Sequence, residues 1–144
     1  SYCKSVDEVW HAGDIGSIEV VDKIKRLKPL KAVYGNIDNH LIRNEFPLDY
    51  RFSCENIRVW ITHIGGYPNR YSKRISEGLK SEKVDLFICG HSHILKVIND
   101  KKHNLLHINP GAIGKHGFHN KRTMVRFEID GKKIENLEII EFNR

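Results

Sequence analysis

The segment Leu86-Phe87-Ile88-Cys89 is apolar at every position and runs directly into Gly90-His91-Ser92-His93. A strand that is apolar at successive positions is buried on both faces, which places it inside a covered sheet. The two histidines that follow can aim both imidazoles into one space, and imidazole is the commonest protein metal ligand. An H-x-H pair also fits an ordinary surface loop. Other stretches therefore have to indicate the same place before a metal site is inferred.

Length and composition are those of one domain of a soluble globular protein. The chain has 144 residues, of which 40% are hydrophobic and 29% charged, enough for a sizeable core. No apolar run approaches the about 20 residues of a membrane span, and the chain shows no secretory signal pattern. We expect a single domain over residues 1–144, located in the cytoplasm and without a membrane partner.

The charge balance is basic, with 24 Lys+Arg against 18 Asp+Glu and a net charge of +6. Such a charge attracts phosphate-bearing partners at long range. The basic residues are nevertheless dispersed, and no RNA-binding aromatic signature is present. A solvated surface is therefore the preferred interpretation over a dedicated nucleic-acid interface. The sequence does not indicate an oligomeric state.

Hydrophobic periodicity indicates a mixed α/β chain. Residues 18–27 have helical spacing and follow the capping residue Ser17, between strands at 6–12 and 30–34, which implies a parallel pair. The remaining expected elements are strands at 50–54 and 57–61, a helix at about 70–82, a strand at 84–89, and strands at 95–98, 105–108, 124–129 and 134–142 that make the last third mostly antiparallel. The segment after Asn36 that holds Pro47 is expected to be a loop.

Four expected strands end directly before a side chain that can bind a metal. These endings are Gly13-Asp14, Gly35-Asn36, Thr62-His63 and Gly90-His91-Ser92-His93. Ligands of α/β sheets gather beyond the carboxyl ends of the strands, so the four endings are expected on one rim. Each has another interpretation: Asp14 as a helix-start residue, Asn36 as a turn residue, His63 as a buried hydrogen-bonded histidine, and the histidine pair as a surface loop.

The order of these motifs, followed by Asn109-Pro110-Gly111-Ala112, resembles the calcineurin-like metallophosphoesterases. The resemblance covers almost the whole chain and is to the small single-domain bacterial and archaeal phosphodiesterase branch. It implies a mixed α/β fold in which a two-sheet β-sandwich is flanked by helices. It also implies two divalent metal ions and a small phosphate-ester substrate.

The resemblance assigns roles to matching residues. Asp14 would bridge both metals, and Asn36, His63 and His91 would complete the shell of one metal. His93 would bind the other metal. The family's first motif, Asp-x-His after the first strand, is absent here. We therefore expect that the N-terminal strand and most of the first helix are missing from the sequence as given, with residues 1–5 resembling the tail of a helix.

These ligands imply phosphate-ester hydrolysis, most plausibly of phosphodiesters, by a metal-bound hydroxide at a dinuclear site. Mixed nitrogen and oxygen ligands suit Mn²⁺ first, and Fe, Zn²⁺ or Ni²⁺ as well. Asn36 contributes a neutral amide oxygen on the substrate side, which limits negative charge beside an anionic substrate.

Larger members of the superfamily have a general-acid histidine after the asparagine, where this chain has Ile37. His40 could substitute as the acid or be a solvent-exposed loop histidine. Asp38 could act in catalysis, although fixing the loop suits it better, and Arg43 could meet a substrate phosphate or lie on the surface. Weak substrate-side candidates also follow the Asn109 turn, namely His116 and His119.

A second hypothesis is a catalytically weak or inactive scaffold of the same fold that binds a protein partner, as the retromer subunit of similar fold does. Ile37 and the absent first motif favour the scaffold. Asn36 and the three histidines His63, His91 and His93 favour the enzyme, which is the preferred hypothesis.

Overall fold

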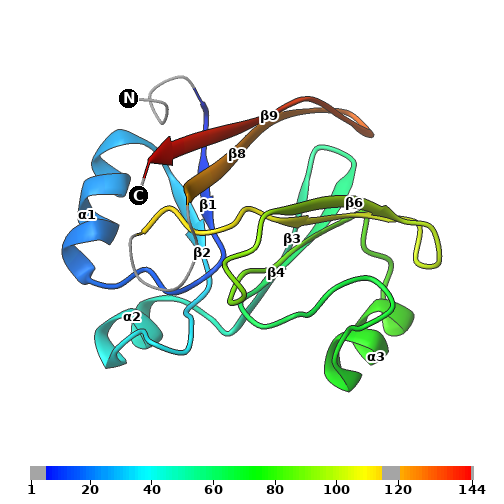
Figure 1. The fold of residues 1–144 in the computed structure, drawn as a ribbon, viewed down its shortest axis with the longest axis horizontal. Coiled ribbons are helices and arrows are strands. Elements are labelled where there is room, and N and C mark those ends of the chain that lie inside the picture. The colour runs from blue at the N-terminus through cyan, green and yellow to red at the C-terminus, as the bar shows by residue number, and fades with distance from the viewer. Residues whose placement is uncertain (1–5, 115–120, 144) are drawn as a thin grey trace.

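The computed structural model describes residues 6–114 and 121–143 (Figure 1). Residues 1–5 and the candidates His116 and His119 lie outside these ranges. The elements in chain order are β1 (Val9–His11), α1 (Ile18–Leu27), β2 (Leu30–Ala32), α2 (His40–Glu45), β3 (Asp49–Cys54), β4 (Ile57–Thr62), α3 (Lys73–Ser81), β5 (Leu86–Ile88), β6 (Lys96–Asp100), β7 (Leu105–Asn109), β8 (Lys121–Asp130) and β9 (Lys133–Asn143).

The first unit is a strand, a helix and a parallel strand. The hydroxyl of Ser17 accepts a hydrogen bond from the amide of Val20 and caps α1, and β1 then pairs with β2 in parallel. Helices α1 and α2 pack against this pair through a buried cluster of Ile15, Val21, Ala32, Ile42 and Phe46. The two helices therefore form an outer layer on this side of the molecule.

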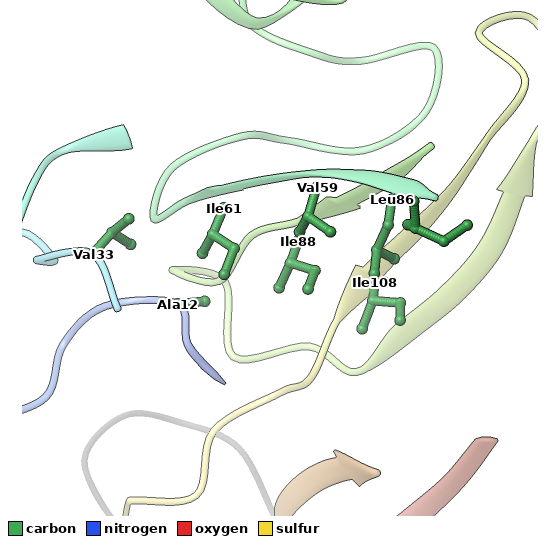
Figure 2. Close-up of a cluster of buried hydrophobic side chains, with 8 residues drawn as sticks. Ala12, Val33, Val59, Ile61, Leu86, Ile88 and Ile108 are labelled. Atoms are coloured by element: carbon green, nitrogen blue, oxygen red, sulfur yellow. The ribbon is translucent and has the colours of Figure 1, made fainter. Parts of the chain in front are cut away.

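The central sheet has the strand order β3-β4-β5-β7-β6. Strands β4, β5 and β7 are parallel, and β3 and β6 join their edges in antiparallel pairs. One face of this sheet carries a row of buried aliphatic side chains, and Figure 2 shows them projecting from the same side: Val59, Ile61, Leu86, Ile88 and Ile108. Ala12 and Val33 from the loops after β1 and β2 complete this core.

The two faces of the central sheet are covered differently. On the first face the β8–β9 hairpin packs over the aliphatic core, and Phe127 of β8 meets Trp10 of β1 edge to face at 5.8 Å. On the second face α3 covers Trp60 and Phe87 with Ile75 and Leu79. The molecule is thus a two-layer β-sandwich flanked by helices (Figure 1), which confirms the expected fold class.

The segment expected to be a loop after Asn36 contains a helix, so that expectation is wrong. Asn39 caps α2 by accepting a hydrogen bond from the amide of Ile42. Ile42 and Phe46, four residues apart, are the pair that α2 buries. Six residues are too few to display a helical period in the sequence.

Other expectations differ in detail. Strands β1, β2 and β5 are shorter than expected. Strands β1 and β5 begin later than expected and each ends one residue early, whereas β2 is shortened only at its end, where the chain turns toward Gly35 and Asn36. Strand β7 is antiparallel to β6 yet parallel to β5, so the last third is less uniformly antiparallel than expected. Strands β8 and β9 are joined at Asp130-Gly131 as expected, with Gly131 at φ 61°.

Within residues 6–114 and 121–143, no helix has both the length and the apolar character that crossing a membrane requires. Cys54 and Cys89 are both free thiols. Burial raises the pKa of the Cys89 thiol to about 12. Cys89 therefore serves as an apolar packing residue beneath α3.

Replacing Leu86 by alanine tests the central sheet. Leu86 is fully buried between β4 and β7, so Leu86→Ala is expected to lower the free energy of unfolding by about 3 kcal/mol. The matched control is Leu27→Ala, because Leu27 is 41% exposed at the end of α1. We expect that control to change the unfolding free energy by less than about 0.5 kcal/mol in urea titrations. Equal losses in the two variants would contradict the assigned core.

His107 is expected to make stability fall in mild acid. The side chain is fully buried on β7, and burial lowers its pKa to about 4, partly opposed by the negative charge of Asp100. Between pH 6.5 and 4 the unfolded chain binds a proton that the folded chain excludes, so the free energy of unfolding decreases as the pH falls. From pH 7 to pH 5, His107→Leu should lose about 1 kcal/mol less stability than the parent chain, and parallel curves would contradict this.

Candidate metal centre

Four loops from two different layers meet at one point. Asp14 follows β1, Asn36 follows β2, His63 follows β4 and His91 follows β5. The first two strands belong to the β1–β2 pair and the last two to the central sheet. Contacts between the loops hold them together: His63 contacts the carbonyl of Ala12 and the side chain of Asn36, and its own carbonyl accepts from the amide of Gly90.

His63 joins the two layers. Its ring is buried, with 3% exposure, and its Nδ1 lies 2.7 Å from the carbonyl oxygen of Ala12 in the loop after β1. Its own carbonyl accepts a hydrogen bond from the amide of Gly90, 2.9 Å away. His63 therefore fixes the loops after β1 and β5 relative to β4.

Donor atoms of four side chains are packed together. His63 Nε2 lies 2.9 Å from Asn36 Oδ1 and 3.2 Å from Asp14 Oδ2. His91 Nδ1 lies 3.1 Å from the same Asn36 oxygen, and the two imidazole rings are 5.3 Å apart. Neighbouring donors of one metal shell lie about 3 Å apart when metal–ligand distances are about 2.1 Å. The separations match that spacing.

The orientation of the His63 ring decides which nitrogen faces the other side chains. The Ala12 carbonyl can only accept a hydrogen bond, so Nδ1 of His63 donates to it. Nε2 is then the ring nitrogen that faces the oxygens of Asn36 and Asp14. Because both of these oxygens are acceptors, either a proton on Nε2 or a cation between the three atoms would satisfy them.

Within the described residues, no group of three or more His, Cys, Asp or Glu side chains has the arrangement of a metal site. His63 and His91 both contact the side-chain oxygen of Asn36, an amide residue that is not one of these four types. In donor chemistry the set still fits a divalent cation, since it offers imidazole nitrogen, amide oxygen and carboxylate oxygen.

The backbone holds the candidate ligands in unusual conformations. Asp14, His91 and His93 have φ values of 57°, 71° and 62°, in the left-handed region. Each such non-glycine residue costs about 1–3 kcal/mol and persists only where its surroundings enforce it. His93 is half-buried in the same turn as His91. Holding the loops that carry these side chains in place therefore costs folding free energy.

Glycine permits the close approach of two of these loops. A Cβ at Gly35 would lie 2.1 Å from Asp14 Oδ1 and 2.2 Å from the Asp14 amide nitrogen. Gly13, at φ 102°, would place a Cβ 2.5 Å from His63 Nδ1. Larger side chains at either position would separate Asp14 and His63 from their neighbours.

Asp38 is buried, with 3% exposure, and holds the loops after β1 and β2 together. Its carboxylate accepts hydrogen bonds from the amides of Ile15, Gly16 and Gly35 at 3.1, 2.9 and 2.8 Å. With both oxygens engaged by backbone amides, Asp38 has the arrangement of a loop anchor.

His40 is the first residue of α2 and not a loop residue, which corrects the sequence expectation. It is exposed, and within the described residues it makes no hydrogen bond or ion pair to the four clustered side chains. Arg43, one turn later, donates through Nε to the Asp38 carbonyl at 2.8 Å and through Nη2 to the Asn36 carbonyl at 3.2 Å. Arg43 thus lies beside the loop that carries Asn36.

Sequence reasoning missed the supports behind the histidine turn. The Tyr67 hydroxyl contacts Ser92 Oγ, and the Asn109 amide donates to Ser92 Oγ and to the Gly90 carbonyl, both at 3.1 Å. These contacts orient the turn that carries His91. The Asn109-Pro110-Gly111 motif was the only feature of the sequence that indicated these supporting contacts.

His11 supports the turn after β1. Its Nδ1 accepts a hydrogen bond from the amide of Gly13 at 3.1 Å. Burial lowers the pKa of His11, partly opposed by the negative charge of Asp38. The neutral ring provides the lone pair that this hydrogen bond needs.

Gly35→Ala is expected to weaken Mn²⁺ binding at least tenfold, about 1.4 kcal/mol, because the added methyl displaces Asp14. Electron paramagnetic resonance of free Mn²⁺ measures the affinity. The control is Gly114→Ala, since a Cβ there meets nothing within 4 Å. Unchanged affinity in Gly35→Ala, or equal losses in both variants, would contradict the assigned contact.

Comparisons with known proteins agree with this architecture. The chain is 28% identical over 134 residues to a probable metallophosphoesterase of Methanothermobacter thermautotrophicus, covering 92% of this chain and 74% of that protein. It is 30% identical over 110 residues to a probable metallophosphoesterase of Methanocaldococcus jannaschii, covering 75% of this chain and 54% of the relative.

Solved structures share the fold. An archaeal phosphodiesterase superposes with a TM-score of 0.75 at 22% identity, covering 96% of this chain and 85% of that one. Wild-type Vps29 of Entamoeba histolytica, complexed with Zn²⁺, has a TM-score of 0.72 at 16% identity, covering 96% and 82%. The model of the calcineurin-like phosphoesterase superfamily domain matches residues 1–132, and the chain therefore belongs to the calcineurin-like phosphoesterase superfamily.

Proposed function

We propose that this chain hydrolyses small phosphodiesters with two divalent metal ions. The observation that carries the proposal is the convergence of His63 Nε2, Asn36 Oδ1 and Asp14 Oδ2, with the first atom 2.9 and 3.2 Å from the other two. Nitrogen and oxygen donors at this spacing suit a divalent cation, and the chain belongs to a family of phosphoesterases.

One ion would be held by Asp14, Asn36, His63 and His91. His93, from the same turn as His91, would serve the second ion, and Asp14 would bridge the two. Mn²⁺ suits this mixture of nitrogen and oxygen donors first, and Fe, Zn²⁺ and Ni²⁺ also suit it. The Zn²⁺ complex of Vps29, a protein of the same fold, supports binding of a divalent ion in this architecture.

When bound, the ions supply a nucleophile from water at neutral pH and neutralise charge on the phosphoryl oxygens. The chain's own residues prepare that place. Asn36 would bind the metal ion through an uncharged amide oxygen on the substrate side. An uncharged ligand does not repel an anionic ester. The hydrogen bond to Ala12 orients the His63 ring before any ligand arrives.

The two positions considered for a general acid do not provide one beside the cluster. Ile37, which is 50% exposed, follows Asn36, and within the described residues His40 forms no hydrogen bond or ion pair with Asp14, Asn36, His63 or His91. Esters whose leaving groups depart without a proton are therefore favoured. The likeness to an archaeal phosphodiesterase supports diesters as the substrate class.

The second candidate function is a partner-binding scaffold. It is favoured by Ile37 at the position of the expected acid and by the exposure of Ile64 and Ile94, at 49% and 61%, directly after His63 and His93. Exposed apolar side chains beside a candidate site suit a protein partner as well as a substrate. The enzyme remains preferred because Asp14, Asn36, His63 and His91 bring together the nitrogen and oxygen donors that a divalent cation needs.

The test is hydrolysis of bis(p-nitrophenyl) phosphate by the purified protein, together with measurement of its metal content. We expect Mn²⁺ to stimulate turnover. Asn36→Ala and His91→Ala should each reduce kcat/KM by at least about 100-fold, as loss of a ligand does.

The matched control is Asn99→Ala, an exposed asparagine on β6, which should retain activity within about twofold. If turnover is unchanged in both Asn36→Ala and His91→Ala, these residues do not form the catalytic site. Absence of Mn²⁺-stimulated turnover in the parent protein would favour the scaffold instead.

A further inference from the structure

A cavity of about 510 Å³ opens beside the candidate metal centre. Asn36 and His63 belong to both, and the cavity extends from them to Leu48 and Ile64. Pockets of about 300–1,000 Å³ take small organic ligands. The cavity is therefore large enough for a group attached to a phosphate that lies at the metal centre.

Arg43 brings an uncompensated positive charge to this cavity. Its guanidinium donates to the carbonyls of Asp38 and Asn36 at 2.8 and 3.2 Å and lies 4.7 Å from the centre of the Tyr34 ring. These groups fix the guanidinium without carrying a negative charge. Within residues 6–114 and 121–143, no Asp or Glu forms an ion pair with Arg43.

The other arginine in the cavity differs. Arg74 Nη1 lies 2.6 Å from Asp49 Oδ2, and Nη2 donates to Thr62 Oγ1 at 3.1 Å. Its charge is neutralised and its fork is occupied. A fixed guanidinium with no carboxylate is a binding group for phosphate or carboxylate, so within this cavity the anion-binding position is Arg43.

The cavity also offers apolar surface. Leu48 and Ile64 are 45% and 49% exposed, which is unfavourable for large aliphatic side chains unless something covers them. Both side chains line the cavity together with Asn36 and His63. An organic group with a charged end would cover them and still reach Arg43.

We infer that the cavity receives one organic arm of the phosphodiester substrate, and that this arm carries its own phosphate or carboxylate, which Arg43 binds. The inference rests on the proposed function, because the scissile phosphate is assigned to the centre formed around Asn36 and His63. It adds the substrate class: diesters with a second anionic group. Nucleotides that carry an additional phosphate are one such class.

Two probes isolate the second charge. Thymidine 5′-(p-nitrophenyl phosphate) and its 3′-phosphorylated derivative have the same scissile diester and the same leaving group. We expect kcat/KM to be about tenfold higher for the 3′-phosphorylated probe, the size of one charge-assisted hydrogen-bonded contact. Equal values for the two probes in the parent protein would overturn the inference.

Arg43→Gln should reduce the ratio of the two kcat/KM values to about one. Arg43→Lys keeps the charge but loses the fork and the contact with the Tyr34 ring, so it should retain part of the preference. The control is Arg58→Gln, which removes the same charge from an exposed side chain paired with Asp85 on the outside of β4. If the ratio of the two kcat/KM values falls equally in Arg58→Gln, the preference comes from the net charge of +6 and not from Arg43. That result would overturn the inference.

Binding measured by calorimetry separates this inference from the proposed function. Thymidine 3′,5′-bisphosphate should bind about tenfold more tightly than thymidine 5′-phosphate, and Arg43→Gln should abolish the difference. If neither probe is hydrolysed, the phosphodiesterase proposal fails, and the calorimetric comparison still decides the role of Arg43. Equal affinities of the two nucleotides would overturn that role.

Discussion

The hydrogen bond between His63 Nδ1 and the carbonyl of Ala12 connects the two layers of the sandwich at the place where their strands end. It selects the tautomer of the imidazole and so determines which nitrogen faces Asp14 and Asn36. This buried contact of 2.7 Å thus fixes the positions of the loops and determines which ring nitrogen is available to a metal ion. The metal assignment and the substrate assignment depend on it.

The rest of the site makes this contact rigid. Asp38 ties the loop after β1 to the loop after β2 through three backbone amides, and Gly35 permits the approach that those bonds require. Behind the turn after β5, Asn109 holds the Gly90 carbonyl. Ligands fixed in this way lose little freedom on binding an ion. The left-handed conformations of Asp14 and His91 lower the stability of the folded chain, which is the cost of fixing these loops.

Local patterns in the sequence predicted most of the fold. The cap Ser17, the apolar runs and the turn at Asp130-Gly131 are short-range signals, and the confirmed sandwich follows from their order. Helix α2 was missed because its six residues include a single buried one, Ile42, and so carry too little periodicity. The bounds of β1, β2 and β5 were predicted less accurately: β2 ends early, where the chain enters the loop that carries Asn36, and β1 and β5 begin later than expected.

The candidate site was predictable as a set of residue types and not as a set of contacts. Glycines followed by Asp14, Asn36 and His91 indicated loops that could approach an ion. The supports of those loops are contacts between residues far apart in the chain, such as Ala12 with His63 and Ile15 with Asp38, and no local pattern in the sequence indicates which residues will meet. The central claim is most directly tested by anomalous diffraction from crystals grown with Mn²⁺. We predict a peak about 2.1–2.3 Å from His63 Nε2 and Asn36 Oδ1. No peak there, with the Asn36 amide turned so that its nitrogen donates to His63 Nε2, would contradict the account.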